Sequence, residues 1–140
     1  MIRYTFSKEE RLTSKVLLNA LFETGKRFTA YPVRLFWVPA SLKSSYPVQV
    51  VFGVGKSRFP RAVDRNQIKR WMRESWRHRK HELYQFLEAR QQSLAIMIVY
   101  SSSEFPDQAG IDKAMDVALE KLQRKIQKEE NPESDDQGSE

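Results

Sequence analysis

The sequence contains no cysteine, and this absence excludes several kinds of chemistry at once. A chain without cysteine forms no disulfide, no thiolate metal site and no catalytic thiol, which fits a reducing cytoplasm. The sequence also lacks a run of eighteen apolar residues, and its first residues, MIRYTFSKEERL, lack the apolar core of a signal peptide. We therefore expect a cytoplasmic protein that does not enter a membrane.

Acidic residues are scarce in most of the chain and concentrated near its end. The formal net charge is +6, but six of the 18 acidic residues lie between positions 129 and 140. The first 128 residues contain all 24 basic residues and only 12 acidic ones. Such an excess favours a polyanionic partner. The last residues, EENPESDDQGSE, have no apolar side chain to bury, so we expect one domain at 1–127 and a disordered acidic tail at 128–140.

Three segments have the composition of β-strands: residues 31–38, 48–55 and 94–100. The last of them, LAIMIVY, is apolar enough to be buried on both faces. In the first segment, alternation separates two faces, one with Val33, Leu35 and Trp37 and the other with Arg34, Phe36 and Val38.

Helical spacing of apolar residues predicts helices before, between and after these strands. The first begins at Thr13 or Ser14, either of which suits an N-cap, and ends at Gly25, which we expect in the left-handed conformation. The last is opened by Asp107 or Asp112. In chain order the pattern is helix, strand, strand, helix, strand, helix. It predicts a small α/β (α+β) two-layer sandwich with helices on one face of the sheet.

The most informative segment is the basic run at 58–80, RFPRAVDRNQIKRWMRESWRHRK. Eight of the twenty positions from 61 to 80 are arginine or lysine, against Asp64 and Glu74 alone. At about 100° per residue, one arc of this helix carries Ile68, Trp71, Met72 and Ser75, with Trp76 at its edge. The other arc carries Asn66, Lys69, Arg70, Arg73, Arg77 and Lys80, with Arg65 beside the first turn. A merely solvated helix would mix charges to gain i,i+4 pairs, so this arc favours nucleic acid as partner.

The basic run resembles the signature of the bacterial ribonuclease P protein component. Residues 62–74, AVDRNQIKRWMRE, follow that family's pattern A-V-x-R-N-x-x-K-R-x-x-R-E. Residues 52–57, FGVGKS, resemble its strand and lysine-bearing turn, and the pair Arg11-Leu12 with the following helix resembles its amino-terminal segment. In order and spacing, the resemblance extends from residue 9 to residue 125.

The resemblance implies both a fold and a function. The fold is ribosomal-protein-like, with a mostly antiparallel sheet and a left-handed β-α-β crossover through the basic helix, whereas the usual hand is right. The function is that of a protein subunit of ribonuclease P, the endoribonuclease that matures the 5′ end of tRNA, in which the RNA subunit performs the hydrolysis. The implied partners are ribonuclease P RNA and precursor tRNA, with a monomeric protein and with Mg²⁺ bound mainly by the RNA.

The same resemblance assigns RNA-binding residues position by position. Arginine forks and lysine ammonium groups suit phosphate oxygens, which position a nucleic acid without reading its sequence. Gln67 departs from the basic residue that the family often has after the Arg-Asn pair. The predicted RNA-binding residues are Arg65, Asn66, Lys69, Arg70, Arg73 and Arg77, with Lys56 and Arg58 extending the surface.

A second predicted site is a cleft for the single-stranded 5′ leader of precursor tRNA. An exposed ring at Phe36, with Arg34 two residues earlier on the same face, suits a stacked base and its phosphate. By the resemblance, Phe22 forms the opposite wall, and Leu18 stands where the family commonly has a second aromatic residue. The alternative is that Phe22, Leu18 and Phe36 are simply core residues.

We expect no catalytic residue and no metal site in the chain itself. The Gly-Lys-Ser at 55–57 would need a glycine at position 50 to form a phosphate loop, and that residue is Val50. His78 and His81 lack the further ligands of a zinc site, and Asp64 and Glu74 suit ion pairing or capping. The alternative function is a ribosomal or other structural RNA-binding protein. A helix-turn-helix regulator fits less well, because the basic helix follows a strand.

Overall fold

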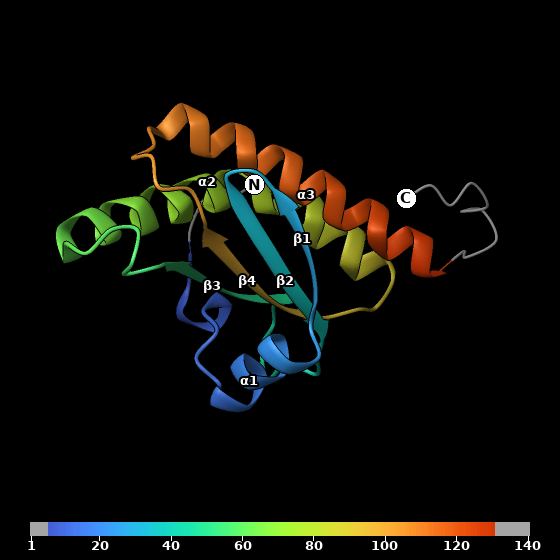
Figure 1. Cartoon of the computed structure of the whole chain (residues 1–140). Coiled ribbons are helices and arrows are strands. Elements are labelled where there is room, and N and C mark those ends of the chain that lie inside the picture. The colour runs from blue at the N-terminus through green and yellow to red at the C-terminus, as the bar shows by residue number, and fades with distance from the viewer. Residues whose placement is uncertain (1–5, 131–140) are drawn as a thin grey trace.

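Four strands and three α-helices make up residues 6–130, the part of the chain that the computed structural model describes (Figure 1). The helices are α1 (Lys15–Glu23), α2 (Ala62–Ala89) and α3 (Gln108–Glu130), and a 3-10 helix, η1 (Lys8–Glu10), precedes them. The strands are β1 (Lys26–Ala30), β2 (Val33–Pro39), β3 (Val48–Val54) and β4 (Leu94–Tyr100). The predicted mixed α/β fold is confirmed. No helix in this part of the chain is long and apolar enough to span a membrane.

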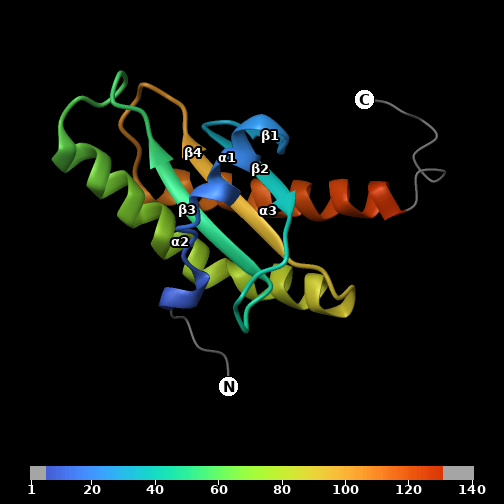
Figure 2. The ribbon, with the colours of Figure 1, turned by 90° about the horizontal axis from the view of Figure 1, so that it is seen from below.

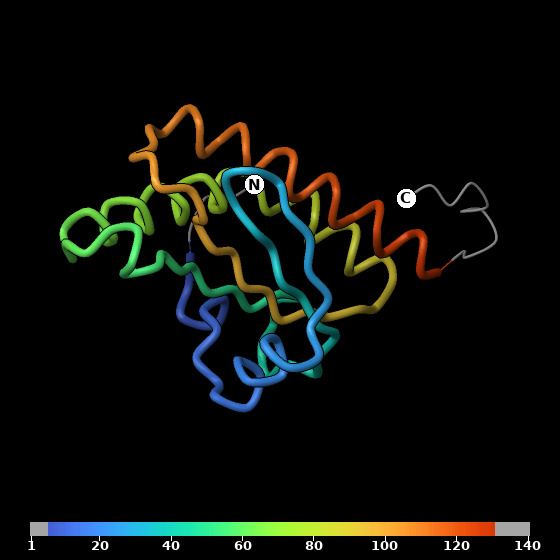
Figure 3. Tube along the Cα trace, in the orientation of Figure 1, coloured from blue at the N-terminus to red at the C-terminus, as the bar shows by residue number. Residues whose placement is uncertain are grey.

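Strand β1 is an element that the hydrophobic pattern does not predict. Its sequence, KRFTA, is short and largely polar, and only Phe28 and Ala30 are buried. It pairs antiparallel with β2 through a turn at Tyr31 and Pro32, as the chain trace shows (Figure 3). The strand therefore exists because β2 offers it hydrogen-bonding partners and a buried surface, which no local periodicity reports.

The sheet is mostly antiparallel, as predicted, with the order β1-β2-β4-β3. β2 runs antiparallel to both of its neighbours, whereas β3 and β4 are parallel. Two parallel neighbours need a crossover connection, and α2 supplies it. Viewed from the α1 side, α2 passes behind the sheet and β4 lies to the right of β3, so the crossover is left-handed (Figure 2). This is the uncommon hand that the family resemblance implies.

The sheet separates two apolar layers. α2 and α3 cover one face, and α1 lies on the other (Figures 1 and 2). The predicted alternation in β2 is confirmed: Leu35 and Trp37 belong to the large core under α2 and α3. Phe36 belongs to a smaller core under α1, together with Leu21. The expectation that helices cover one face alone is therefore incomplete, because α1 covers part of the second face.

The start of α1 agrees with the prediction from the sequence, whereas the conformation of the glycine after its end differs from it. Ser14 is the N-cap, and its hydroxyl accepts a hydrogen bond from the Leu17 N–H at 3.3 Å. The prediction of a left-handed Gly25 is wrong, because its φ lies outside the left-handed region. A Cβ at this position would lie 2.4 Å from the carbonyl oxygen of Leu21. Glycine is needed here for a close approach of the backbone and not for a left-handed turn.

The two long helices extend further than the sequence pattern suggests. α2 is one helix of 28 residues that continues past His81, and Trp76 is fully buried in it. α3 begins after Asp107, whose carboxylate accepts a hydrogen bond from the Gly110 N–H at 2.8 Å, and it ends at Glu130. Residues 128–130, predicted to belong to the disordered tail, are therefore helical. The rest of the predicted tail, 131–140, lies outside the described residues.

A buried ion pair joins the amino-terminal segment to α2. The Glu10 carboxylate is fully buried and accepts hydrogen bonds from Lys80 Nζ at 2.5 Å, the Tyr84 hydroxyl at 2.6 Å and the Ser7 N–H at 2.8 Å. Lys80 is only 2% exposed, so its predicted place on the arc of exposed cations is wrong. Burial raises the pKa of Glu10, but the hydrogen bonds from Lys80, Tyr84 and Ser7 outweigh it and hold that pKa below the ordinary value. Burial also raises the pKa of Tyr84.

We expect this carboxylate to make the domain sensitive to acid. A lowered pKa in the folded state means that its contribution to stability is present above pH 4.5, the ordinary value, and is lost as the pH falls below it. Glu10→Gln should remove part of that pH dependence. At neutral pH it should cost about 3–5 kcal/mol, because Lys80 stays buried without a counter-charge. Urea unfolding at a series of pH values measures both effects, and the exposed Glu120→Gln is the control. Identical acid sensitivity of both variants and the wild type would exclude Glu10 as the cause.

Candidate RNA-binding surface

The first half of α2 presents a row of polar side chains on the side away from the core. Its apolar stripe, with Ile68 and Met72, packs in the large core, and this packing fixes the direction of the opposite stripe. Steps of three and four residues place the predicted side chains on that side. The row consists of the exposed Asn66, Arg70 and Arg73, with the half-buried Lys69 at its border. The structure thus brings these four predicted residues together.

Arg65 and Arg77 differ from that row, because each has a partner within the protein. Arg65 Nη1 donates to the carbonyl oxygens of Phe59 at 2.9 Å and Pro60 at 2.8 Å, and so holds the loop before α2. Arg77 Nη2 donates to Glu74 at 2.6 Å, an ion pair of the kind predicted for Glu74. A guanidinium has five N–H donors, so either residue retains donors for a phosphate.

Acidic partners are distributed unevenly along α2. In its second half, Arg79 Nε donates to Asp116 of α3 at 2.8 Å. Among residues 6–130, no carboxylate lies within ion-pair distance of Lys69, Arg70 or Arg73. α3 therefore neutralises the second half of the helix, and the first half keeps a positive potential that attracts an anion.

A groove with a volume of ≈ 450 Å³ runs beside the polar row. α2 contributes Lys69 and Arg73 to its wall, and β3 contributes residues 50–52. The amino-terminal segment forms the other wall with Phe6 and residues 11–13, which include the exposed Arg11. The sequence analysis did not include Arg11 among the predicted RNA-binding residues. The pair Arg11-Leu12 resembles the family's amino-terminal segment, and this resemblance was the signal that could have found it.

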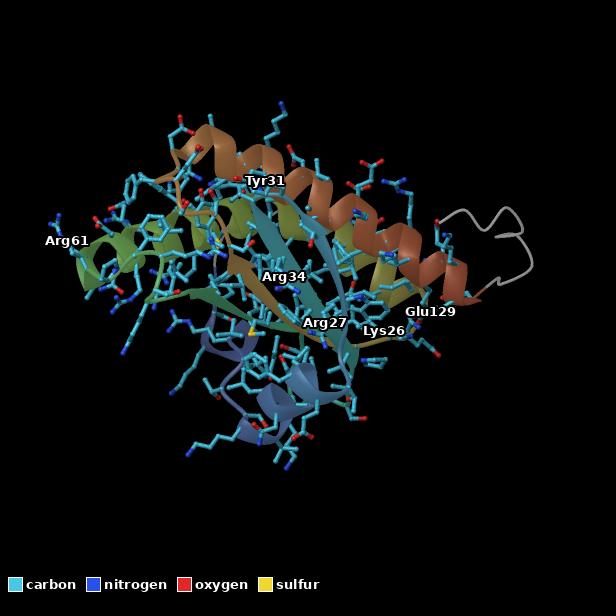
Figure 4. All side chains as sticks on the ribbon, viewed as in Figure 1. Lys26, Arg27, Tyr31, Arg34, Arg61 and Glu129 are labelled. Atoms are coloured by element: carbon cyan, nitrogen blue, oxygen red, sulfur yellow. The ribbon has the colours of Figure 1, made fainter. Side chains whose placement is uncertain are left out.

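Lys56 and Arg58 lie in the loop between β3 and α2, and both are exposed. Arg61, at the start of α2, is exposed at the far end of the same loop (Figure 4). Among the described residues, none of these three cations has a carboxylate within ion-pair distance. The loop therefore prolongs the positive surface beyond the edge of the sheet.

The residues of the predicted leader cleft meet between α1 and the sheet. The ring centroids of Phe22 and Phe36 are 6.3 Å apart, so the two predicted walls do face each other. Phe22 is 60% exposed, whereas Phe36 is only 7% exposed. The expectation of an exposed ring at Phe36 is wrong, because it packs with Leu21 and the half-buried Leu18 in the core under α1. Burial of Phe36 agrees with the alternative that it is a core residue, while Phe22 stays open to solvent.

Two guanidinium groups lie over the ring of Phe36. The Cζ atom of Arg27 is 5.4 Å from the ring centroid, and that of Arg34 is 5.6 Å from it. Arg27 comes from β1, where it lies opposite Phe36 in the strand register, and both arginines sit on the sheet (Figure 4). Sequence reasoning missed Arg27 because it missed β1. Cations above an aromatic ring are attracted by its π-face, and their remaining donors suit phosphate oxygens.

The described residues contain no group of three histidine or acidic side chains that could hold a metal ion. His78 Nε2 lies 3.8 Å from the Glu74 carboxylate, which already binds Arg77. Glu74 thus forms an ion pair with Arg77 on the surface of α2, as the sequence indicated, and His78 lies beside this pair.

Comparison with known proteins finds similarity to ribonuclease P proteins. The family model described as Ribonuclease P matches residues 6–123. The ribonuclease P protein component of Porphyromonas gingivalis is 36% identical over 116 residues, which cover 83% of this chain and 85% of that protein. The structure of the RNase P protein from Thermotoga maritima superposes with a TM-score of 0.62 and 19% identity, over 80% of this chain and 96% of that one. That from Staphylococcus aureus has a TM-score of 0.61 and 15% identity, over 82% and 96%.

The solved structures share the fold, and the sequence matches extend over most of the chain. Residues 6–123 contain the polar row of α2, the groove beside it and the aromatic pair between α1 and β2. The chain therefore belongs to the ribonuclease P protein family.

Proposed function

We propose that this chain binds ribonuclease P RNA and the 5′ leader of precursor tRNA, and that it contributes binding rather than catalytic groups. Its family makes it the protein component of ribonuclease P, the ribonucleoprotein endoribonuclease of tRNA 5′ processing. The RNA subunit carries out the hydrolysis, and the protein holds the RNA chains and screens their repulsion. The monomeric state of the protein and its cytoplasmic location stay predictions.

The observation that carries the proposal is the unneutralised first half of α2. Lys69, Arg70 and Arg73 project from one rigid helix and have no acidic partner among residues 6–130. Repulsion between neighbouring cations destabilises the folded protein when it is alone. A phosphate backbone relieves this repulsion and releases its own counterions, which makes binding favourable at low salt.

The pair of Phe22 and Phe36 supports the second part of the proposal, the leader cleft. Phe22 offers an open ring on which an unpaired base can stack. Arg27 and Arg34 lie close by, over Phe36, where they can bind the phosphates on either side of that base. Phe36 supports the site from beneath, and Leu18 fills the space beside it.

We infer that the divalent metal of ribonuclease P is held mainly by the RNA. Residues 6–130 contain no cluster of carboxylates or histidines that fits such an ion. Mg²⁺ prefers oxygen ligands and keeps several waters, a set that RNA phosphates provide. When bound, such an ion activates water and stabilises the leaving oxygen. The cations of α2 position the RNA phosphates near which this chemistry occurs.

Charge reversal at Arg73 should weaken binding to ribonuclease P RNA without unfolding the domain, because the side chain is exposed. With about six phosphate contacts, the wild-type affinity should fall about 10³-fold or more between roughly 50 and 200 mM salt. Arg73→Glu should make that salt dependence shallower by about one contact. Arg124→Glu makes the same change on the exposed side of α3 and is the control. Titration of labelled RNA over a salt series measures the affinity of each variant. A flat salt response of the wild type, or equal losses of affinity in Arg73→Glu and Arg124→Glu, would contradict the proposal.

Phe22→Ala should weaken binding of leader-bearing precursor tRNA by about 1–3 kcal/mol, because a base loses its stacking partner. Binding of mature tRNA, which has no leader, should change little. Val16→Ala is the matched control, since Val16 is also exposed on α1.

Phe36→Ala should lose a similar amount of leader binding and, in addition, about 3–5 kcal/mol of folding stability, because its ring is buried. Equal losses for precursor and mature tRNA would remove the leader cleft from the proposal.

The purified chain by itself should leave precursor tRNA intact, even with Mg²⁺. Added to a bacterial-type ribonuclease P RNA, it should accelerate a single cut at the 5′ end of the mature tRNA, because its cations lower the repulsion between the two RNA chains. Gel analysis of end-labelled precursor tRNA measures both outcomes. Site-specific cleavage by the RNA-free protein would contradict the division of labour, and failure to stimulate the RNA would favour a structural RNA-binding role.

A further inference from the structure

We propose that Arg11 is an RNA-binding residue and that the buried Glu10 beside it is its positioning residue. Arg11 is exposed and lines the groove whose opposite wall carries Lys69 and Arg73. Its Cζ atom lies 5.6 Å from the centroid of the Phe6 ring. No carboxylate among residues 6–130 lies within ion-pair distance of it. Arg11 therefore lines the same groove as the two α2 cations and comes from the amino-terminal segment.

The backbone on both sides of Arg11 is fixed. On one side, Glu10 is held by Lys80 at 2.5 Å and by Tyr84 at 2.6 Å. On the other side, the N–H of Leu12 donates to the carbonyl oxygen of Val50 at 3.0 Å, and Arg11 itself forms a bridge with Val50. Glu10 points into the core and Arg11 points out of it. The position of the guanidinium thus depends on the anchoring of the residue before it.

A positional role explains why this segment is anchored by charge. Two well-packed apolar side chains would contribute as much stability as a buried ion pair, because both charges must be removed from water. Two segments joined by an apolar contact can shift along each other and still keep that contact. The Glu10 carboxylate, in contrast, binds Lys80, Tyr84 and the Ser7 N–H together in only one register of the two segments. The pair therefore places Glu10 beside Lys80, about two turns of α2 beyond Arg73 and about three turns beyond Lys69. It sets the distance between the two walls of the groove.

This inference rests on the proposed binding of ribonuclease P RNA, and a double-mutant cycle tests it. Arg11→Ala should lower the affinity for that RNA about tenfold, the effect of one lost charged hydrogen bond. The double substitution Glu10→Gln with Lys80→Met removes both buried charges, so that no unpaired charge stays in the core. It should lower the affinity by a similar factor and make the salt dependence shallower by about one contact. Combined with Arg11→Ala, it should cause no further loss, because its effect acts through Arg11.

Two further variants keep the test decisive. Glu9→Gln alters the neighbouring carboxylate of the same 3-10 helix, which accepts from Ser45, and should leave RNA affinity unchanged. Tyr84→Phe deletes one hydrogen bond to Glu10 and keeps the ion pair, so it serves if the double substitution fails to fold. It should cause a smaller loss of affinity that likewise disappears when Arg11 is alanine. Circular dichroism and urea unfolding establish that each variant is folded.

The outcomes separate this inference from the proposed function. If Arg73→Glu weakens RNA binding but a folded Glu10 variant does not, the inference is wrong and the proposed function stands. The inference would also be wrong if the loss of RNA affinity in the Glu10 variants added fully to the loss in Arg11→Ala, because Glu10 would then act independently of Arg11. If neither Arg73→Glu nor Arg11→Ala changes RNA binding, the proposed function itself fails.

Discussion

The packing of α2 on the sheet is the constraint on which the rest of the structure depends. This helix is the crossover between two parallel strands, and its apolar stripe, with Ile68, Met72 and Trp76, is fully buried. Burying such side chains contributes about 1.5–3 kcal/mol each, so the helix has little freedom to rotate about its axis. The direction of every cation on α2 follows from that packing. The helix acts as a rigid support that holds charged groups at fixed spacing.

The electrostatics of α2 divide it into two parts with different roles. In the second half, acidic residues of α3 and of the amino-terminal segment neutralise Arg79 and Lys80, so that charge there serves the fold. In the first half, the cations have no such partners among the described residues, and their repulsion is an unfavourable term that RNA can remove. One helix therefore links the stability of the domain to the binding of its partner. The boundary lies near the Glu74–Arg77 pair.

The face of the sheet under α1 combines aromatic rings with cations. Phe36 is buried by α1, which leaves Phe22 as the open ring and places Arg27 and Arg34 above the closed one. The groove along α2 lies at the edge strand β3 and includes residues from both faces of the sheet: Phe52 packs in the core under α2 and α3, whereas Val51 packs against the core under α1 that contains Phe36.

Local sequence determined much of this protein. Periodicity predicted β2, β3, β4 and α3 and the polar row of Asn66, Arg70 and Arg73, and residue type predicted a cap at Thr13 or Ser14, because each feature depends on residues within a few turns or one strand. The family pattern at 62–74 then indicated the uncommon hand of the crossover and the partner, neither of which periodicity contains.

Only the tertiary structure decided the features that join distant segments. β1 exists because β2 lies beside it, and Arg27 reaches the aromatic site through that pairing. Lys80 has the spacing of an exposed cation, yet it lies in the core because Glu10, seventy residues earlier in the chain, brings a carboxylate to it. Phe36 has the spacing of an exposed ring, yet α1 covers it. A helical or strand period reports which side chains share a face, and only the packing of distant elements determines what that face meets.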